Sequence, residues 1–507
     1  MNSFFSTSEK RTLDILEYLY SENKTWFLPE IASAIHCSIK SVSQSISILN
    51  NLVEENNLTC SIFLEDKGGV YLQTDSYAEI HLLKILFVRT TASYQLLDKI
   101  FQSPNVTIDQ LQEELFLSRS TIYRKLEIIE QVLLKNKLTL SKTTLTIEGD
   151  ETAIREFFYV FYFSLVDPNI WPFKTISSSV LKNGLGTFQL ESKLELTSTE
   201  KLQLIYRSAI NTIRYQQQRF VQEFPIDIYV ADNIKEGFSN VDKNLLARIP
   251  AKHQEMEKKY LTYLYVTYPS TEIFEDPSQI RAIVNWHKHN NSDAYYLVST
   301  LLQHIETAYP EMKEKSLFTS NEFLYKLISV ANYGLLFPHL YVELALNDRW
   351  DRRLRTLSFS SLDQPKFTKI LWDAISAITE SVTFPLINPS HVFYFIYSIF
   401  SQYLDLKYFE SSISVKIVLE VGYLAEELLS RELQSIFPQK IFVETSKINY
   451  DHKTHYDLII SDLDYLASNY SNSLKRYVLN YPPSNRDIGA LKNIIEELSI
   501  SKLLESN

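Results

Sequence analysis

Residues 107–133 read TIDQLQEELFLSRSTIYRKLEIIEQVL, two short segments of helical periodicity separated by a tight break. The first segment opens with Thr107 and Gln110, the two members of a capping box that satisfies backbone amides at a helix start. Ser118 stands where an N-cap of the second segment is expected. The apolar positions recur at helical spacing and are Leu111, Leu115, Ile122, Leu126 and Ile129. Two helices joined by a tight turn predict a helix-turn-helix.

The same pattern occurs 80 residues earlier, in LPEIASAIHCSIKSVSQSISILNNLV at 28–53. A shift of 80 aligns Ser38 with Ser118 and brings five apolar positions into register without a gap: Ile31, Ile35, Val42, Ile46 and Leu49. Amphipathic segments precede the two units at 12–20 and 81–101, and predicted hairpins follow them at 60–74 and 137–149. This order predicts two winged helices. Ordinary three-helix packing is the alternative, and the hairpins and exposed polar side chains argue against it.

The second helix of each predicted unit has polar positions outside its apolar stripe. In the second unit they are Ser118, Arg119, Ser120, Thr121, Tyr123, Arg124 and Lys125. In the first unit they are Lys40, Ser41, Ser43 and Gln44. Guanidinium and hydroxyl groups are the donors that phosphates and base edges accept from. Residues 116–142 carry six Lys or Arg against two Glu, so we expect the second unit to supply most of the DNA affinity. The lysines after 134 are equally well explained as a solvated face of the hairpin.

Composition narrows the class of protein. A chain of 507 residues is too long for one core, and 45% hydrophobic residues with only 9 glycines favour a mainly helical, multidomain fold. Two cysteines, Cys37 and Cys60, are too few for a disulfide framework or a cysteine-rich zinc site. The N-terminus lacks a signal peptide, and the longest apolar stretch, 392–404, is too short to cross a bilayer. We therefore expect a cytoplasmic protein that contacts no membrane.

The charge balance and the motifs bear on function. A net charge of −11 restricts any contact with nucleic acid to a local surface. The sequence contains no Walker loop, GxGxxG, HExxH or GxSxG, so we predict that the protein is not an enzyme and needs no cofactor. The histidines at 287, 289 and 304 form only a weak metal-like cluster, and no metal site is predicted.

The paired units, the phrase LSRSTIYRKLEIIEQVL at 117–133 and the run TIEGDETAIREFFYVFYF at 146–163 resemble the Mga/AtxA-type global and virulence regulators of Gram-positive bacteria. The resemblance implies a transcriptional regulator, here predicted to be an activator, that binds double-stranded promoter DNA as a homodimer. It also implies two helical phosphotransferase-regulation domains and a C-terminal α/β domain similar to enzyme IIB of sugar transport systems. The implied division is winged helices at 1–76 and 77–165, regulation domains at 166–290 and 291–408, and the IIB-like domain at 409–507.

Phosphotransferase-regulation domains carry histidines that accept phosphate from a phosphocarrier protein, and the resemblance extends this role to two positions. His304 lies in the predicted opening helix of the second domain, and His391 starts a late helix. The first domain has glutamines at 216–218 instead of a histidine, which puts its phosphorylation in doubt. Both histidines also have a purely structural explanation.

The C-terminal segment reads as strands at 413–420, 440–445 and 456–462 with helices between and after them, a small domain with a mainly parallel sheet. Catalytic enzyme IIB domains of this kind have a cysteine just after the first strand, where this chain has Glu420-Val421-Gly422. We therefore expect a scaffold for self-association without phosphotransfer chemistry. Two alternatives remain: an RNA-binding antiterminator, which would start with a small β domain, and an interaction scaffold that no longer binds DNA.

Overall fold

The structure is a computed structural model. It describes residues 4–65, 68–167, 170–192, 195–224, 226, 249–264, 277–310, 316–337, 365–380, 389–404, 406, 412–437, 440–445, 455–464 and 473–505. The chain divides into two compact units. The first consists of residues 1–294, 328–351 and 385–388, and the second of residues 295–327, 352–384 and 389–507.

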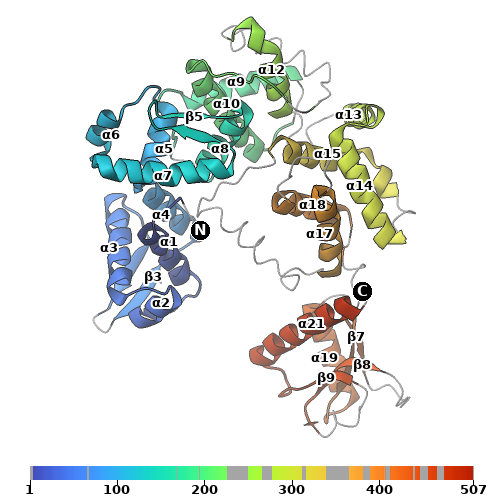
Figure 1. The fold of residues 1–507 in the computed structure, drawn as a ribbon. Coiled ribbons are helices and arrows are strands. Elements are labelled where there is room, and N and C mark those ends of the chain that lie inside the picture. The colour runs from blue at the N-terminus through green and yellow to red at the C-terminus, as the bar shows by residue number, and fades with distance from the viewer. Residues whose placement is uncertain are drawn as a thin grey trace. The chain divides into compact units, whose positions relative to one another are not determined.

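The first winged helix occupies the N-terminus and is drawn in dark blue in Figure 1. Its helices are α1 (Thr7–Tyr20), α2 (Leu28–Ala34) and α3 (Ile39–Glu55), and its strands are β1 (Trp26–Phe27), β2 (Ser61–Leu64) and β3 (Gly69–Gln73). The predicted hairpin is the antiparallel pair β2–β3, and β1 joins it to give the order β1-β3-β2. The sequence analysis did not predict β1, which is only two residues long.

The second winged helix follows directly. Its helices are α4 (Tyr77–Thr90), α5 (Ala92–Gln102), α6 (Ile108–Leu115) and α7 (Arg119–Lys135), and its wing is the hairpin of β4 (Thr139–Ser141) and β5 (Thr146–Glu148). The single helix expected over 81–101 was wrong. Thr91 adopts an extended conformation and its side chain accepts a hydrogen bond from the Tyr94 amide, so the chain breaks into α4 and α5 there. A threonine cap competes with the continuing helix at that position.

The repeat of 80 residues extends to the backbone. His36 and Phe116, the residues in the two turns, both lie in the left-handed region with φ of 54° and 53°. After the long helices, Asn57 and Lys137 do so again with φ of 51° and 52°. Three positions of the apolar stripe in each long helix are buried: Val42, Ile46 and Leu49 in α3, and Ile122, Leu126 and Ile129 in α7. The two units are therefore copies of one architecture, as their sequences predict.

The two winged helices share one apolar core with the helices that follow. This core runs from Phe4 through both units into α8 (Glu151–Phe163) and α10 (Ser198–Gln216). Asp150 caps α8 immediately after the second wing by accepting a hydrogen bond from the Ala153 amide at 2.9 Å. The wing thus leads directly into a helix that belongs to the same core as the two winged helices.

The described residues between 170 and 404 form helices and connecting loops. The helices not yet named are α9 (Ser178–Ser192), α12 (Ala251–Thr262), α13 (Pro277–His289), α14 (Asp293–Ala308), α15 (Asn321–Leu336), α17 (Pro365–Glu380) and α18 (Pro389–Tyr403). Residues 290–292 connect α13 to α14. Aromatic side chains dominate this region, for example where Phe323 packs edge-on against Phe400 at 5.2 Å between ring centres.

The C-terminal domain is a four-stranded sheet with helices, drawn in red tones in Figure 1. It consists of β6 (Ile413–Val418), α19 (Tyr423–Ile436), β7 (Ile441–Glu444), β8 (Tyr456–Ser461), β9 (Ser473–Val478) and α21 (Asn485–Glu505). All three strand pairs are parallel and the order is β7-β6-β8-β9. The predicted α/β character is confirmed. The strand β9 was missed because the adjacent charged residues Lys475 and Arg476 interrupt any apolar alternation in SLKRYV, which lies at the sheet edge. None of the described helices is long and apolar enough to cross a membrane.

Candidate nucleic-acid interface

The start of α7 is a cluster of hydroxyl groups. Ser118 caps the helix, and its Oγ accepts a hydrogen bond from the Thr121 amide at 3.2 Å. The same Oγ lies 3.0 Å from the Ser120 hydroxyl and 2.8 Å from the Thr121 hydroxyl. A capped helix N-terminus with spare amides and hydroxyls is a favourable place for a phosphate oxygen.

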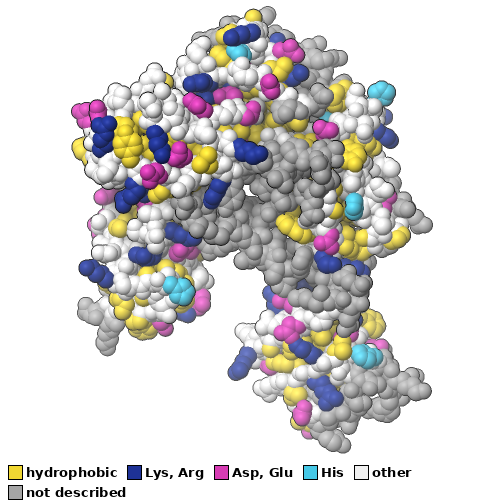
Figure 2. Space-filling view, in the orientation of Figure 1, with side chains coloured by type: hydrophobic (Ala, Val, Ile, Leu, Met, Phe, Trp, Pro, Cys, Tyr) yellow, Lys and Arg dark blue, Asp and Glu magenta, His cyan; other side chains and the backbone are white. Residues whose placement is uncertain are grey.

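The outward face of α7 carries the groups predicted to contact DNA. Ser120, Tyr123 and Arg124 are exposed at i, i+3 and i+4, opposite the buried stripe of this helix. The Arg119 side chain is 61% exposed, and its guanidinium lies 3.6 Å from the carboxylate of Asp109 on α6. This pair is open to water and is worth little, so Arg119 remains available to a phosphate. Figure 2 shows basic and acidic side chains interspersed over α6 and α7.

Lys125, which the sequence groups with the DNA-contacting residues, does not belong to this face. Its side chain is 7% exposed, and its ammonium donates to both carboxylate oxygens of Glu9 on α1 at 3.1 Å. The equivalent residue of the first unit, Ser45, is also buried and bonds the Thr12 hydroxyl of α1 at 2.9 Å. Helix α1 therefore contacts both long helices on the side away from the exposed face. Lys125 thus connects the buried side of α7 to α1.

The wing also carries a lysine whose charge is paired with an acidic residue of the protein itself. The Lys142 ammonium lies 2.7 Å from a carboxylate oxygen of Glu130 on α7 and ties the wing to that helix. At the wing turn, Thr144 donates to the Ser141 hydroxyl at 2.7 Å and lies 2.7 Å from the Thr146 hydroxyl. The local excess of positive charge counted from the sequence is thus partly used inside the protein, and Arg119 and Arg124 are the exposed cations at the start of α7.

The first unit offers a less charged surface. Ser38 caps α3 by accepting a hydrogen bond from the Ser41 amide at 3.2 Å. Lys40 and Gln44 are exposed, whereas the Ser43 hydroxyl donates to the Ile39 carbonyl within the helix at 3.2 Å. These groups suit backbone contacts and supply only one positive charge, in keeping with the smaller role expected for this unit.

The two histidines singled out in the sequence lie on different helices of the second compact unit. His304 is exposed on α14, and its Nδ1 lies 2.9 Å from the carbonyl oxygen of Thr300. Because a carbonyl can only accept, Nδ1 carries a proton, and Nε2 is the atom left for other chemistry. His391 falls within α18, and its side chain lies outside the described residues. Among the described residues no group of three or more His, Cys, Asp or Glu is arranged to hold a metal ion.

A buried ionic network behind the second wing was not predicted. The Arg155 guanidinium donates to both oxygens of Glu257 at 2.8 Å and to Glu151 at 2.9 Å. Arg214 donates to Glu151 at 2.9 and 2.7 Å, and Glu257 also accepts from the Tyr215 hydroxyl at 2.8 Å. The signal for this network was present in the sequence, since charged residues at 151, 155 and 156 stand at the start of a helix whose remaining residues, 157–163, are apolar and mostly aromatic. The network joins α8, α10 and α12.

Two winged helices with exposed polar faces on α3 and α7 define a helix-turn-helix regulator. Comparison with known proteins agrees with that class, because residues 77–162 match the family model described as the Mga helix-turn-helix domain.

Three curated regulators are similar to this chain. The capsule synthesis positive regulator AcpB of Bacillus anthracis is 24% identical over 63% of this chain and 65% of its own length. A trans-acting regulator of Streptococcus pneumoniae is 22% identical over 75% of each chain. The capsule synthesis positive regulator AcpA of Bacillus anthracis is 25% identical over 41% of this chain and 42% of its own length. The chain is therefore similar to Mga/AtxA-type regulators, as its motifs predict, and these relatives are regulators and not enzymes.

Proposed function

We propose that this protein is a transcription activator that binds double-stranded promoter DNA through its two winged helices, with α7 making the main contact. The observation that carries the proposal is the exposed face at the start of α7, where Arg119, Ser120, Tyr123 and Arg124 surround a capped helix N-terminus. An activating role is supported by the names of AcpA and AcpB, which are both positive regulators.

The test is a binding titration of the full chain against random-sequence duplex DNA and single-stranded RNA of equal length over a series of salt concentrations. We expect duplex binding that weakens steeply with salt, because each phosphate contact adds about 0.9 to the slope of log K against log salt. Arg119→Ala combined with Arg124→Ala should reduce that slope by about 1.8. Arg431→Ala combined with Arg486→Ala, an exposed pair in the C-terminal domain, is the charge-matched control.

Each alternative function predicts a different outcome of this experiment. Preferential binding of the RNA would support an antiterminator. Absence of duplex binding at low salt would support a scaffold without DNA contact. An unchanged slope in the Arg119 and Arg124 variant, with duplex binding intact, would remove α7 from the interface.

We further propose the division into two winged helices, two phosphotransferase-regulation domains and an enzyme IIB-like domain, with a phosphocarrier protein as the partner that modifies His304. The exposed position of His304 and the bond from its Nδ1 to Thr300 support this role, since a nucleophilic Nε2 faces solvent. His391 stays a second candidate on the resemblance alone. Phosphorylation would add negative charge to the exposed face of α14 and so bias the contacts that the second compact unit makes.

The C-terminal domain is the proposed dimerisation element. Its sheet is parallel, as an enzyme IIB-like domain requires, and the loop after β6 has no cysteine. In that loop the Glu420 amide donates to the Asp462 carboxylate at 2.9 and 3.1 Å. Beside it, α19 exposes Leu424 and Leu428, 78% and 64% accessible, one turn apart. An exposed leucine pair on one helix face suits contact with a second copy of the chain.

A further inference from the structure

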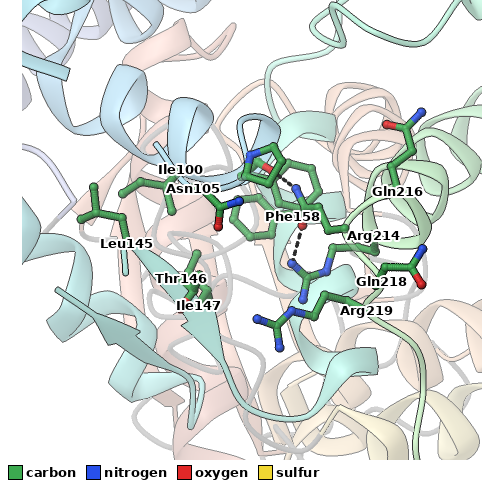
Figure 3. Close-up of a pocket in the computed structure, with 13 residues that line it drawn as sticks. Ile100, Asn105, Leu145, Thr146, Ile147, Phe158, Arg214, Gln216, Gln218 and Arg219 are labelled. Carbon is green, nitrogen blue, oxygen red and sulfur yellow. Dashed lines mark hydrogen bonds between the residues drawn. The ribbon is translucent and has the colours of Figure 1, made fainter. Parts of the chain in front are cut away.

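A cavity of about 270 Å³ lies between the second wing and the start of the helical region. Its wall is made of the end of α5 and the loop after it, residues 145–147 of the wing, Phe158 of α8, and the last turn of α10 with the residues that follow (Figure 3). Every one of these segments belongs to the first compact unit. The cavity therefore contacts both the second winged helix and the segment proposed to be the first phosphotransferase-regulation domain.

The cationic wall of this cavity is formed by Arg214 and Arg219. Gln218 adopts a left-handed conformation with φ of 58°, which reverses the chain after α10 and lets the Arg219 amide donate to the Arg214 carbonyl at 2.9 Å. The reversal brings two arginines that are five positions apart to the same end of the helix. Figure 3 shows their guanidinium groups side by side, directed toward Thr146 on the wing.

The two arginines differ in whether their positive charge is paired with an acidic residue. Arg214 is held by Glu151 at 2.7 Å and by the Gln217 side chain at 2.9 Å, so its position is fixed. Arg219 is exposed and has no ion pair among the described residues. Since Glu151 and Glu257 balance Arg214 and Arg155 in the buried network, the charge of Arg219 is the surplus at this wall.

The remaining wall suits the body of a small molecule. Ile100, Phe101, Leu145 and Phe158 supply apolar surface, and no described residue of the lining is acidic. Gln217 is engaged, because its amide donates to the Phe101 carbonyl at 2.6 Å. A cavity of this size is at the small end of ligand sites and would hold a compact metabolite.

We propose that this cavity binds a small phosphorylated metabolite, with its phosphate on Arg219 beside the fixed guanidinium of Arg214 and its body against the apolar wall. Guanidinium forks recognise phosphate by paired hydrogen bonds, and the surplus charge at Arg219 favours an anion. Because residues 145–147 of the wing form the opposite wall, occupancy would stabilise one position of the wing. Its effect on DNA binding rests on the proposed function, whereas the binding site does not.

Isothermal titration of the full chain in phosphate-free buffer tests the site without DNA. The probes are inorganic phosphate, glucose 6-phosphate, glucose and citrate. We expect glucose 6-phosphate to bind, glucose not to bind, and Arg219→Gln to weaken binding at least tenfold while Arg431→Gln leaves it unchanged. Thr146→Phe, which fills the cavity without changing charge, should also abolish binding.

Three outcomes would overturn the assignment: no binding of either phosphate probe, equal binding to wild type and Arg219→Gln, or binding of citrate alone. Measuring duplex DNA affinity with and without glucose 6-phosphate then tests the coupling, and we expect at least a threefold change that Arg219→Gln removes. Ligand binding without any DNA binding would refute the proposed function and leave the site intact. DNA binding without ligand binding would refute the proposed binding site and leave the proposed function intact.

Discussion

Neighbouring residues 124 and 125 of α7 should separate DNA contact from structural support when each is changed to methionine. Methionine keeps most of the apolar stem of either side chain and removes its charge. Each variant therefore loses one positive charge, one from the exposed face of α7 and the other from its buried side. Arg124 is exposed, and Lys125 is buried against Glu9. The sequence alone makes these residues look equivalent.

The magnitude for Lys125→Met follows from its surroundings. The ammonium makes two hydrogen bonds of 3.1 Å to the Glu9 carboxylate, and loss of one partner of a buried polar pair costs about 1–3 kcal/mol. Glu9 is 18% exposed and still accepts from the Ser6 amide at 2.6 Å, so it is not left wholly unsatisfied. We therefore expect a loss of about 2 kcal/mol, or a decrease in Tm of roughly 4–8 °C for the N-terminal transition.

Differential scanning calorimetry and the DNA salt series together form the assay. Lys125→Met should lower Tm and leave the salt slope unchanged, whereas Arg124→Met should reduce the slope by about 0.9 and change stability by less than about 0.5 kcal/mol. A double-mutant cycle with Glu9→Gln should give a coupling energy near 1–2 kcal/mol. If Lys125→Met reduces the slope as much as Arg124→Met while Tm stays constant, the inward assignment of Lys125 is refuted.

Three other predictions concern separate parts of the chain. Burial raises the pKa of Glu151, but the hydrogen bond from Arg214 and the charge of Arg155 outweigh it and hold that pKa below its ordinary 4.5; its stabilising charge is therefore complete above this pH and lost as the pH falls through the lowered folded-state value. Urea unfolding between about pH 6 and pH 3.5 should accordingly show a smaller acid loss in Glu151→Gln than in wild type, and an equal loss would contradict the assignment. Leu424→Asp with Leu428→Asp should convert a dimer to a monomer in light scattering, and a persistent dimer would place the contact elsewhere. His304→Ala should abolish labelling of α14 by a phosphorylated phosphocarrier protein, with labelling retained if another residue is the acceptor.

Local features of this fold were predictable because they depend on near neighbours. The caps at Ser38 and Ser118 and the buried stripes of α3 and α7 follow from spacing within a few turns. The copy at a shift of 80 residues strengthened each of these predictions, since chance matches rarely keep register. The parallel C-terminal sheet was predicted for a similar reason, namely that buried apolar strands alternate with helices.

Features that depend on distant partners were not predictable. Lys125 looks like a surface lysine until Glu9, 116 positions away, is placed beside it. Thr91 interrupts a pattern that would otherwise continue as one helix, and only the packing of α4 and α5 shows which alternative wins. The cavity behind the wing depends on the left-handed turn at Gln218, for which a run of three glutamines gives no signal.

The buried network constrains how a signal can reach the wing. Arg155 and Glu257 are essentially inaccessible, and breaking such a pair costs about 3–5 kcal/mol, more than the roughly 1–3 kcal/mol of a typical allosteric coupling. We therefore expect helices α8, α10 and α12 to move as one rigid block. The wing joins α8 at Asp150, so a change confined to the wing requires it to shift relative to this block. A sliding contact needs a place where the wing meets α10 without a fixed bond, and the cavity at Arg219 provides one. Regulation in this region is therefore expected to act by shifting the wing against a rigid helical block and not by unfolding the junction.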